Sequence, residues 1–264
     1  MKKKLTIRDL RQAKHDGRQL TEVFVDNPAD AAAAEEAGID ILMTYIGHFK
    51  GLRAAAPNTF MITTHGVNVP TIATADQAVS ASFSAMTDGA DAIYTHLSKD
   101  IVRVMARERI PVVGHVGFVP YYANWLGEPR AVGKKAAEAI QVYRDTLAYE
   151  EAGAIAVEME IVPHRVAAEI AKRVDIMIFS MGSGTAGLAQ FLFATDVLGT
   201  NTGHVPRHSK VYGKLAAELE RLQRLRVEAF QAYNAEVKGG QFPEPKHLLD
   251  VSDREFEAFL KGIG

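Results

Sequence analysis

Two glutamates, Glu158 and Glu160, lie two positions apart in the apolar segment 154–163. Side chains at this spacing on a β-strand point to the same face. On a buried face, desolvation and mutual proximity raise the pKa of at least one carboxyl toward neutrality, which suits a general base. The pattern favours acid–base chemistry at Glu160, which is nearer the end of the segment. Glu158 is equally consistent with the partner of a buried cation.

Five of the nine histidines come at the ends of short apolar segments, namely His48, His65, His96, His115 and His204. Neutral imidazole is the commonest metal ligand and also transfers protons near pH 7. His48, His65 and His96 follow consecutive segments, which is consistent with a three-histidine metal site that keeps an open position. The alternative is that the histidines line one rim and bind an anionic substrate, since the sequence has no HExxH motif.

Hydroxyl groups gather at the ends of the same segments. The candidates for substrate binding are Thr44, Tyr45, Thr64, Tyr94 and Ser180. Ser180 opens a glycine-rich turn over residues 180–185, whose backbone N–H groups could hold a carboxylate or a phosphate. Such a turn is also ordinary between a strand and a helix, so it is a weak signal by itself.

A repeating order of elements must position these residues. Short β-branched segments alternate with alanine-rich helical segments, which indicates a parallel sheet with right-handed crossovers. The predicted strands cover residues 20–25, 39–45, 60–65, 91–96, 110–120, 154–163, 175–184 and 200–206. A helix is predicted over 186–199, before the last strand, and a helical extension from about residue 209.

About eight strand–helix units in this length predict a (β/α)8 TIM barrel, in which the chemistry lies at the C-terminal ends of the strands. A doubly wound open sheet is the alternative. The first predicted strand is followed by no GxGxxG or GxxxxGKS phosphate motif, which favours the barrel. The sequence shows no linker or repeat, so a single domain over residues 1–264 is expected.

Composition excludes several classes of function. The chain of 264 residues has 30 basic and 32 acidic side chains, which argues against a nucleic-acid-binding surface. The absence of cysteine excludes disulfides, thiolate metal sites and a cysteine nucleophile. No apolar run approaches the roughly 20 residues of a membrane helix, and the start does not read as a signal peptide. We therefore expect a soluble cytoplasmic enzyme that acts on a small molecule.

Several segments resemble the ketopantoate hydroxymethyltransferase family. The segment 110–120 resembles its GHxGxxP signature through Gly114, His115, Gly117 and Pro120. The segment 151–163 resembles the stretch that holds the family's catalytic glutamate, with Glu160 at that position. Further matches run in the same order from about residue 4 to about residue 247.

This resemblance implies a (β/α)8 barrel of the phosphoenolpyruvate mutase and isocitrate lyase superfamily, assembled as a homodecamer. It implies an aldol-type step of pantothenate biosynthesis, in which a divalent metal, usually magnesium, binds a 2-oxo acid and a base forms its enolate. The enolate then attacks a one-carbon unit from methylenetetrahydrofolate. By this resemblance, Glu160 is the base and His115 contacts the substrate.

The chain departs from the family pattern at the positions that bind the metal in the family. The family's Gly-Asp-Ser segment aligns with Tyr45, Ile46 and Gly47, which leaves Gly47 at a substrate-binding position. The family's second aspartate ligand aligns with Thr64. Magnesium prefers hard oxygen ligands, so magnesium binding of the family type is not expected here.

The fourth strand departs as well, because Tyr94 and His96 stand where the family has a lysine and a glutamate. One hypothesis is that histidines bind zinc or a similar ion in place of magnesium. A second is chemistry without a metal, in which Tyr94 and the histidines bind a carboxylate or stabilise an enolate oxygen. The alternatives in function are a carbon–carbon lyase or mutase acting on another small carboxylate, and a barrel that binds a metabolite without catalysis.

Overall fold

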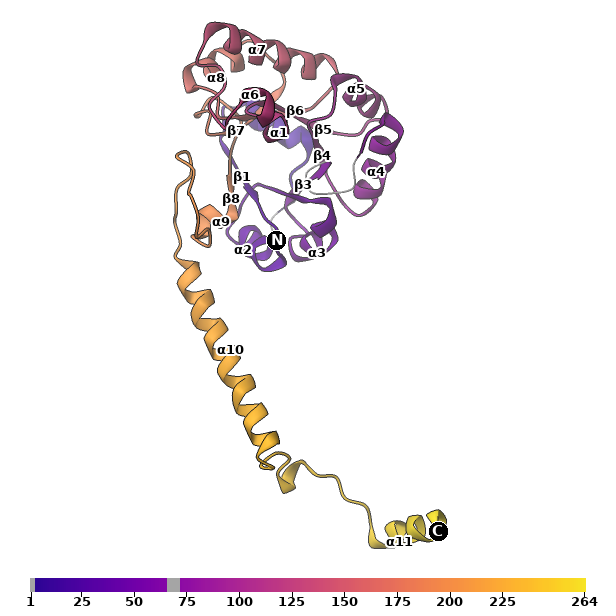
Figure 1. Cartoon of the computed structure of the whole chain (residues 1–264). Coiled ribbons are helices and arrows are strands. Elements are labelled where there is room, and N and C mark those ends of the chain that lie inside the picture. Colours follow the sequence, from indigo (N-terminus) through magenta and orange to yellow (C-terminus); the bar gives the residue numbers. More distant parts are fainter. Residues whose placement is uncertain (1–2, 66–71) are drawn as a thin grey trace. The chain divides into compact units, whose positions relative to one another are not determined.

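Eight parallel strands close into a barrel in the computed structural model, which describes residues 3–65 and 72–264 (Figure 1). The predicted TIM barrel is thus confirmed, with β1 pairing β8 to complete the ring. The strands are β1 Leu20–Phe24, β2 Ile41–Tyr45, β3 Phe60–His65, β4 Ala92–Thr95, β5 Val112–Gly117, β6 Ala156–Glu160, β7 Met177–Met181 and β8 Ala189–Phe193.

Most of the helices beside the barrel lie around the outside of its strands (Figure 1). Several begin where the sequence supplies an N-cap: Thr6 accepts a hydrogen bond from the N–H of Asp9, and Asn27 accepts one from the N–H of Asp30. The helices of the barrel are α1 Ile7–His15, α2 Pro28–Glu36, α3 Phe49–Ala55, α4 Ala75–Thr87, α5 Lys99–Arg107, α6 Ala123–Leu126, α7 Ala136–Glu151, α8 His164–Ala171 and α9 Ala194–Leu198. Two 3-10 turns, η1 Ile46–His48 and η2 Pro120–Tyr122, follow β2 and β5.

The strands are buried on both faces, and their side chains alternate between two apolar layers. One layer fills the inside of the barrel, with Ile41, Met43 and Phe179 among its members. The other lies between the strands and the helices, where Leu42 and Ile178 belong. A strand residue therefore faces the barrel interior only if it has the same parity along its strand as the members of the first layer.

The eighth strand is not where the sequence predicted it. β8 Ala189–Phe193 lies inside the segment 186–199 that was predicted to be helical, and only α9 at its end is a helix. A short apolar run reads equally well as a buried strand or a helix, and here closure of the barrel decides, because β1 pairs with this run over five residues. The segment 200–206 forms no strand, and His204 is an exposed loop residue.

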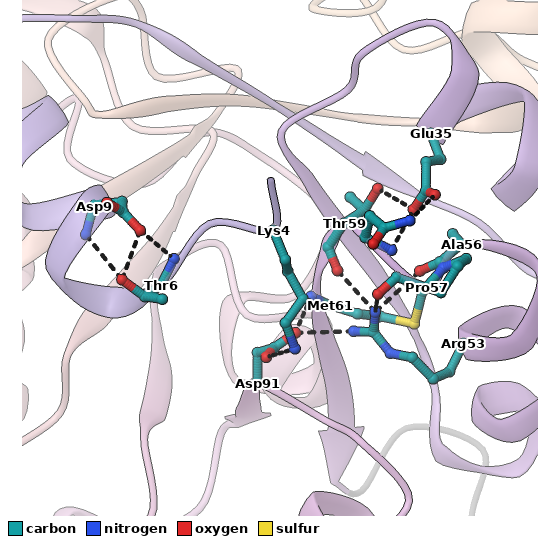
Figure 2. Close-up of polar contacts among 11 residues, drawn as sticks. Lys4, Thr6, Asp9, Glu35, Arg53, Ala56, Pro57, Thr59, Met61 and Asp91 are labelled. Carbon is teal, nitrogen blue, oxygen red and sulfur yellow. Dashed lines mark hydrogen bonds and ion pairs between the residues drawn. The ribbon is translucent and has the colours of Figure 1, made fainter. Parts of the chain in front are cut away.

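A polar network joins the N-terminal ends of β3 and β4, opposite the ends that carry the predicted chemistry (Figure 2). The carboxylate of Asp91 accepts hydrogen bonds from Lys4, from Arg53 and from the N–H of Met61. Arg53 also donates to the carbonyl oxygen of Ala56. The network thus holds the N-terminal ends of β3 and β4 together.

Contacts within the chain divide it into two units, residues 1–213 and 214–264. The second unit contains α10 Leu215–Lys238, η3 Pro245–His247 and α11 Asp253–Ile263, so the predicted helical extension is observed. No residue of α10 or α11 is buried by the described chain. The single domain expected over residues 1–264 stays a prediction. Among the described helices, none has the length and apolar character needed to cross a membrane.

Candidate active site

A cavity of about 390 Å³ opens at the C-terminal ends of the strands. Every one of the eight strands contributes to its wall, as expected of a barrel whose chemistry lies at this end. The lining residues are Phe24, Met43, Tyr45, Thr64, Tyr94, His96, His115, Val119, Pro120, Tyr121, Glu158, Glu160, Met181, Phe191 and Phe193.

His115 connects a hydroxyl to a carboxyl inside this cavity. Its Nδ1 atom is hydrogen bonded to the Tyr94 hydroxyl, and its Nε2 atom lies 3.1 Å from Oε2 of Glu160. A neutral imidazole is a donor at one nitrogen and an acceptor at the other. Nε2 makes no hydrogen bond with the described residues, so His115 packs against the Glu160 carboxyl and keeps this nitrogen available to a ligand.

Both glutamates of β6 face the interior, as the period of two predicts. Burial raises the pKa of Glu160 to about 8. Burial is also the main cause that raises the pKa of Glu158 to about 7, where the charge of Glu160 adds to it and His115 opposes it. Carboxyls with a pKa close to neutrality can both take and give a proton under ordinary conditions.

A third carboxyl, Glu22 of β1, is buried in the barrel. Burial, followed by the charge of Glu158, raises its pKa well above the ordinary value. Neither of its oxygens has a hydrogen-bond partner among the described residues. Sequence analysis missed Glu22 because it considered polar residues only at strand ends. The signal was available, since Leu20 and Phe24 flank Glu22 at a spacing of two on one face.

The glycines of the GHxG segment allow β5 and β6 to bring His115 and Glu160 together. The strands pair with Gly117 opposite Glu160. Gly117 has φ +87°, and a Cβ atom there would overlap the carbonyl oxygen of Glu160. That oxygen accepts a hydrogen bond of 2.8 Å from the N–H of Phe118. Gly114 faces outward, where a Cβ atom would come within 2.5 Å of the Tyr149 ring.

The end of β6 is held in an uncommon conformation. Ile161, next to Glu160, has φ +49°, which is rare for a β-branched residue. Ser183 bridges this point: its hydroxyl donates to the carbonyl oxygen of Met159 at 2.8 Å and accepts from the N–H of Val162 at 2.9 Å. The hydroxyl thus fixes the backbone on both sides of the Glu160–Ile161 pair.

Three of the predicted substrate-binding residues line the cavity. Tyr45, Thr64 and Tyr94 are direct neighbours across β2, β3 and β4, so their hydroxyl-bearing side chains form one arc of the wall. The described residues offer no hydrogen-bond partner to the buried hydroxyl of Thr64. An unpartnered buried hydroxyl at a cavity wall is available to a ligand.

The structure does not place the other three, Thr44, Gly47 and Ser180, in the cavity wall. Thr44 and Ser180 are strand residues of the opposite parity to Tyr45 and Met181, so they face away from the interior. The Ser180 hydroxyl donates to the carbonyl oxygen of Gly184 at 2.7 Å. Gly47 is exposed on η1.

The three histidines predicted to bind a metal are not brought together. His65 faces α4, where its Nε2 atom is 2.9 Å from the Ser82 hydroxyl, and burial lowers its pKa to about 4. His48 is exposed on η1. His96 alone lines the cavity, with its ring centroid 4.2 Å from that of Tyr121.

The arrangement of ligands that the family resemblance implies for magnesium does not fit this site. Thr64 and His96 offer no carboxylate oxygen, and Ile46 packs against the apolar layer outside the barrel. Within the described part of the chain, His115, Glu158 and Glu160 form a different group, whose ligand atoms all lie within 4.8 Å of one another. One nitrogen and two carboxylates make a possible site for a divalent ion such as zinc.

The fold and the cavity define a TIM-barrel enzyme with buried acid–base groups at the C-terminal ends of its strands. A model of the ketopantoate hydroxymethyltransferase family matches residues 44–245, and the chain belongs to this family. The resemblance noted in the sequence is thus confirmed, as is the expectation of an enzyme related to the hydroxymethyltransferases.

Curated relatives match almost the whole chain. The chain is 32% identical to 3-methyl-2-oxobutanoate hydroxymethyltransferase of Thermus thermophilus, over 92% of this chain and 98% of that protein. It is 28% identical to 3-methyl-2-oxobutanoate hydroxymethyltransferase 1 of Methylibium petroleiphilum, over 98% of this chain and 94% of that protein. Among solved structures, 2,3-dimethylmalate lyase, a member of the PEP mutase/isocitrate lyase superfamily, matches with a TM-score of 0.58 at 13% identity. That match covers 98% of this chain and 100% of the lyase chain, and at this identity it shows the fold alone.

Proposed function

We propose that this enzyme removes a proton from the carbon beside a carbonyl group and uses the resulting enolate to form a carbon–carbon bond to a one-carbon unit. Glu160 is the base. The observation that carries the proposal is the contact between His115 and Glu160 inside a cavity at the C-terminal ends of the strands. The names of the relatives support hydroxymethyl transfer as the reaction type.

Different residues of the cavity have different roles in such a reaction. Glu160 accepts the proton from carbon, and His115 packs against its carboxyl. The hydroxyls of Tyr45 and Thr64 donate to the carbonyl oxygen, where negative charge develops as the enolate forms. Apolar side chains such as Phe191 exclude water, which strengthens these interactions.

A divalent ion and a one-carbon donor are further components of the proposed reaction. In a metal-bound form, a divalent ion other than magnesium would be held by one atom each of His115, Glu158 and Glu160, which leaves the second oxygen of Glu160 to act as the base. The ion would supply Lewis-acid polarisation of the carbonyl group. Methylenetetrahydrofolate as the one-carbon donor, a homo-oligomeric state such as a decamer and a cytoplasmic location are proposed on the family resemblance.

Hydrogen exchange tests the enolate step directly. Proton NMR in D2O would follow the C–H beside the carbonyl group in 3-methyl-2-oxobutanoate and its uncharged analogues. We expect exchange with the wild-type enzyme and a loss of at least about 100-fold in Glu160→Gln, since general bases contribute at this scale. Glu36→Gln, on an exposed face of α2, is the matched control. Exchange that survives in Glu160→Gln contradicts the assignment of the base.

The lyase alternative passes through the same enolate. Cleavage of the carbon–carbon bond beside the carbonyl group is the reverse of enolate addition, so it releases that enolate. A separate measurement distinguishes the two. Incubation with the carbonyl compound and methylenetetrahydrofolate, followed by mass spectrometry, reports addition of a hydroxymethyl group. Exchange without addition, together with cleavage of a larger carboxylate, would support the lyase.

A further inference from the structure

A second cavity, of about 460 Å³, adjoins the cavity that contains Glu160. The two meet where β6 and β7 end, because Glu160 and Met181 are paired across these strands and line the first cavity. The next residue of each strand end, Ile161 and Gly182, lines the second. The N–H of Ile161 donates to the carbonyl oxygen of Met181 at 2.8 Å, which holds the two strand ends together.

Basic side chains gather in the wall of this second cavity. The described residues that line it include Lys134, His164, Arg207 and His208, and they include no aspartate or glutamate. Burial lowers the pKa of His208, against the opposing charge of Asp196. The two permanent positive charges of the wall are therefore those of Lys134 and Arg207.

These two cations have no anionic partner. Within the described part of the chain, neither Lys134 nor Arg207 makes an ion pair. Glu138 of the adjoining α7 pairs instead with Arg130 at 2.8 Å. The buried carboxylate of Asp196 accepts two hydrogen bonds from neighbouring side chains. Two unpaired cations at one cavity attract an anion, which would gain charge-assisted hydrogen bonds there.

The glycine-rich turn 180–185 lies against this cavity. Gly182 has φ +67° and Gly184 has φ +88°. A Cβ atom at Gly182 would come within 2.9 Å of the His208 ring, and one at Gly184 within 2.7 Å of the Cβ atom of His164. The N–H of Gly182 donates to no described residue. The turn thus brings two imidazoles and an available N–H to the wall that holds the cations, an arrangement suited to an anion.

We propose that the second cavity binds the carboxylate tail of the one-carbon donor while the reacting end of the donor lies in the first cavity. Methylenetetrahydrofolate ends in a glutamate with two carboxylates, which match the two cations of Lys134 and Arg207. The identity of the donor rests on the proposed function, whereas the anion subsite rests on the residues of the second cavity. The subsite can therefore be measured by binding, without turnover.

A matched pair of ligands tests the subsite. 5-Formyltetrahydrofolate and 5-formyltetrahydropteroate share one ring system, and only the first carries the glutamate. Isothermal titration calorimetry of the intact protein, with and without 3-methyl-2-oxobutanoate, would give both affinities. We expect the glutamate-bearing compound to bind at least about tenfold more tightly, since hydrogen bonds to charged groups contribute at this scale. Equal affinities, or no binding of either compound under either condition, overturn the proposal.

Variants that remove a charge locate the tail. Arg207→Gln and Lys134→Gln change exposed side chains, so the fold should tolerate both. We expect each to reduce the preference for the glutamate-bearing compound at least about threefold, and the double variant to abolish it. Arg107→Gln, at an exposed position of α5, is the matched control and should keep the preference. A preference that survives in the double variant contradicts the proposal.

Citrate is the probe for a free polycarboxylate, the other source of the same chemistry. We expect citrate to compete with 5-formyltetrahydrofolate and not with the compound that lacks the glutamate. Citrate binding that depends on Arg207, with no binding of either folate compound, would make this a site for a separate anion and overturn the assignment to the donor.

Failure of the subsite and failure of the proposed chemistry give different results. If the glutamate preference depends on Arg207 and Lys134 but no hydrogen exchange depends on Glu160, the subsite stands and the assigned base is wrong. If exchange is lost in Glu160→Gln but the two folate compounds bind alike, the chemistry stands and the subsite is wrong.

Discussion

Nε2 of His115 lies 3.1 Å from Oε2 of Glu160, although the two residues are 45 positions apart and belong to neighbouring strands. The pairing of β5 with β6 places Gly117 opposite Glu160, and the close approach at that glycine sets the distance. A buried imidazole in contact with a buried carboxyl restricts how the carboxyl can turn. The relationship therefore links the fold to the chemistry.

Replacement of Tyr94 by phenylalanine removes the group that is hydrogen bonded to Nδ1 of His115. The imidazole then loses the partner that fixes its orientation and its tautomer. We expect hydrogen exchange beside the carbonyl to slow by about 10- to 100-fold with little change in ligand affinity. Tyr212→Phe, at an exposed position, is the control. An unchanged exchange rate in Tyr94→Phe would show that His115 does not need this partner.

The pH dependence of exchange should follow Glu160, whose pKa burial raises to about 8. A base must be ionised, so the rate after chelation should rise as the pH increases from 6 to 9 and then level off. A profile that is flat over this range would contradict the role of Glu160 as the base.

The same raised pKa has the opposite effect on stability. A carboxyl that holds its proton more tightly when folded stabilises the protein below its folded pKa, and this contribution is lost as the pH rises through about 8. Glu160→Gln, which cannot ionise, should therefore lose less stability than the wild type between pH 7 and pH 9. Thermal melts across that range provide the measurement.

His65 should make the fold sensitive to acid. Burial lowers its pKa to about 4, so below pH 6.5 the unfolded chain binds a proton that the folded chain does not. Stability should fall as the pH decreases from about 6.5 to about 4, by up to about 3 kcal/mol from this residue. Urea unfolding of His65→Gln should show a smaller loss over the same range. Equal losses in both proteins would assign the effect to other groups.

Gly117→Ala should disturb the site and the fold together. The new methyl group would overlap the Glu160 carbonyl oxygen, and the positive φ is unfavourable for alanine, so we expect a loss of about 2–3 kcal/mol. Gly47→Ala is the matched control, because a Cβ atom at Gly47 meets no atom within 4 Å. Similar denaturation midpoints for the two variants would contradict the close approach seen at Gly117.

The sequence predicted the barrel and seven of its strands because alternation of apolar segments and helices is a strong local signal. It misplaced β8, since the run Ala189–Phe193 has no alternation of its own and is specified by its partner β1. The same limit applies to the site. The spacing of Glu158 and Glu160 predicted a shared face, but no local pattern tells that Thr44 and His65 face outward while Tyr45 and Thr64 face inward. Only the closed barrel decides that direction.

The polar network around Asp91 ties β3 and β4 at the end of the barrel opposite the cavity. Three of the positions at which this chain departs from its family lie at or just after the other ends of β2, β3 and β4, namely Ile46, Thr64 and His96. Anchoring at one end leaves residues at the far end free to be exchanged without unfolding the strands that carry them. Residues at the cavity end can therefore change during the evolution of these enzymes, and substrate preference with them, while the barrel stays folded.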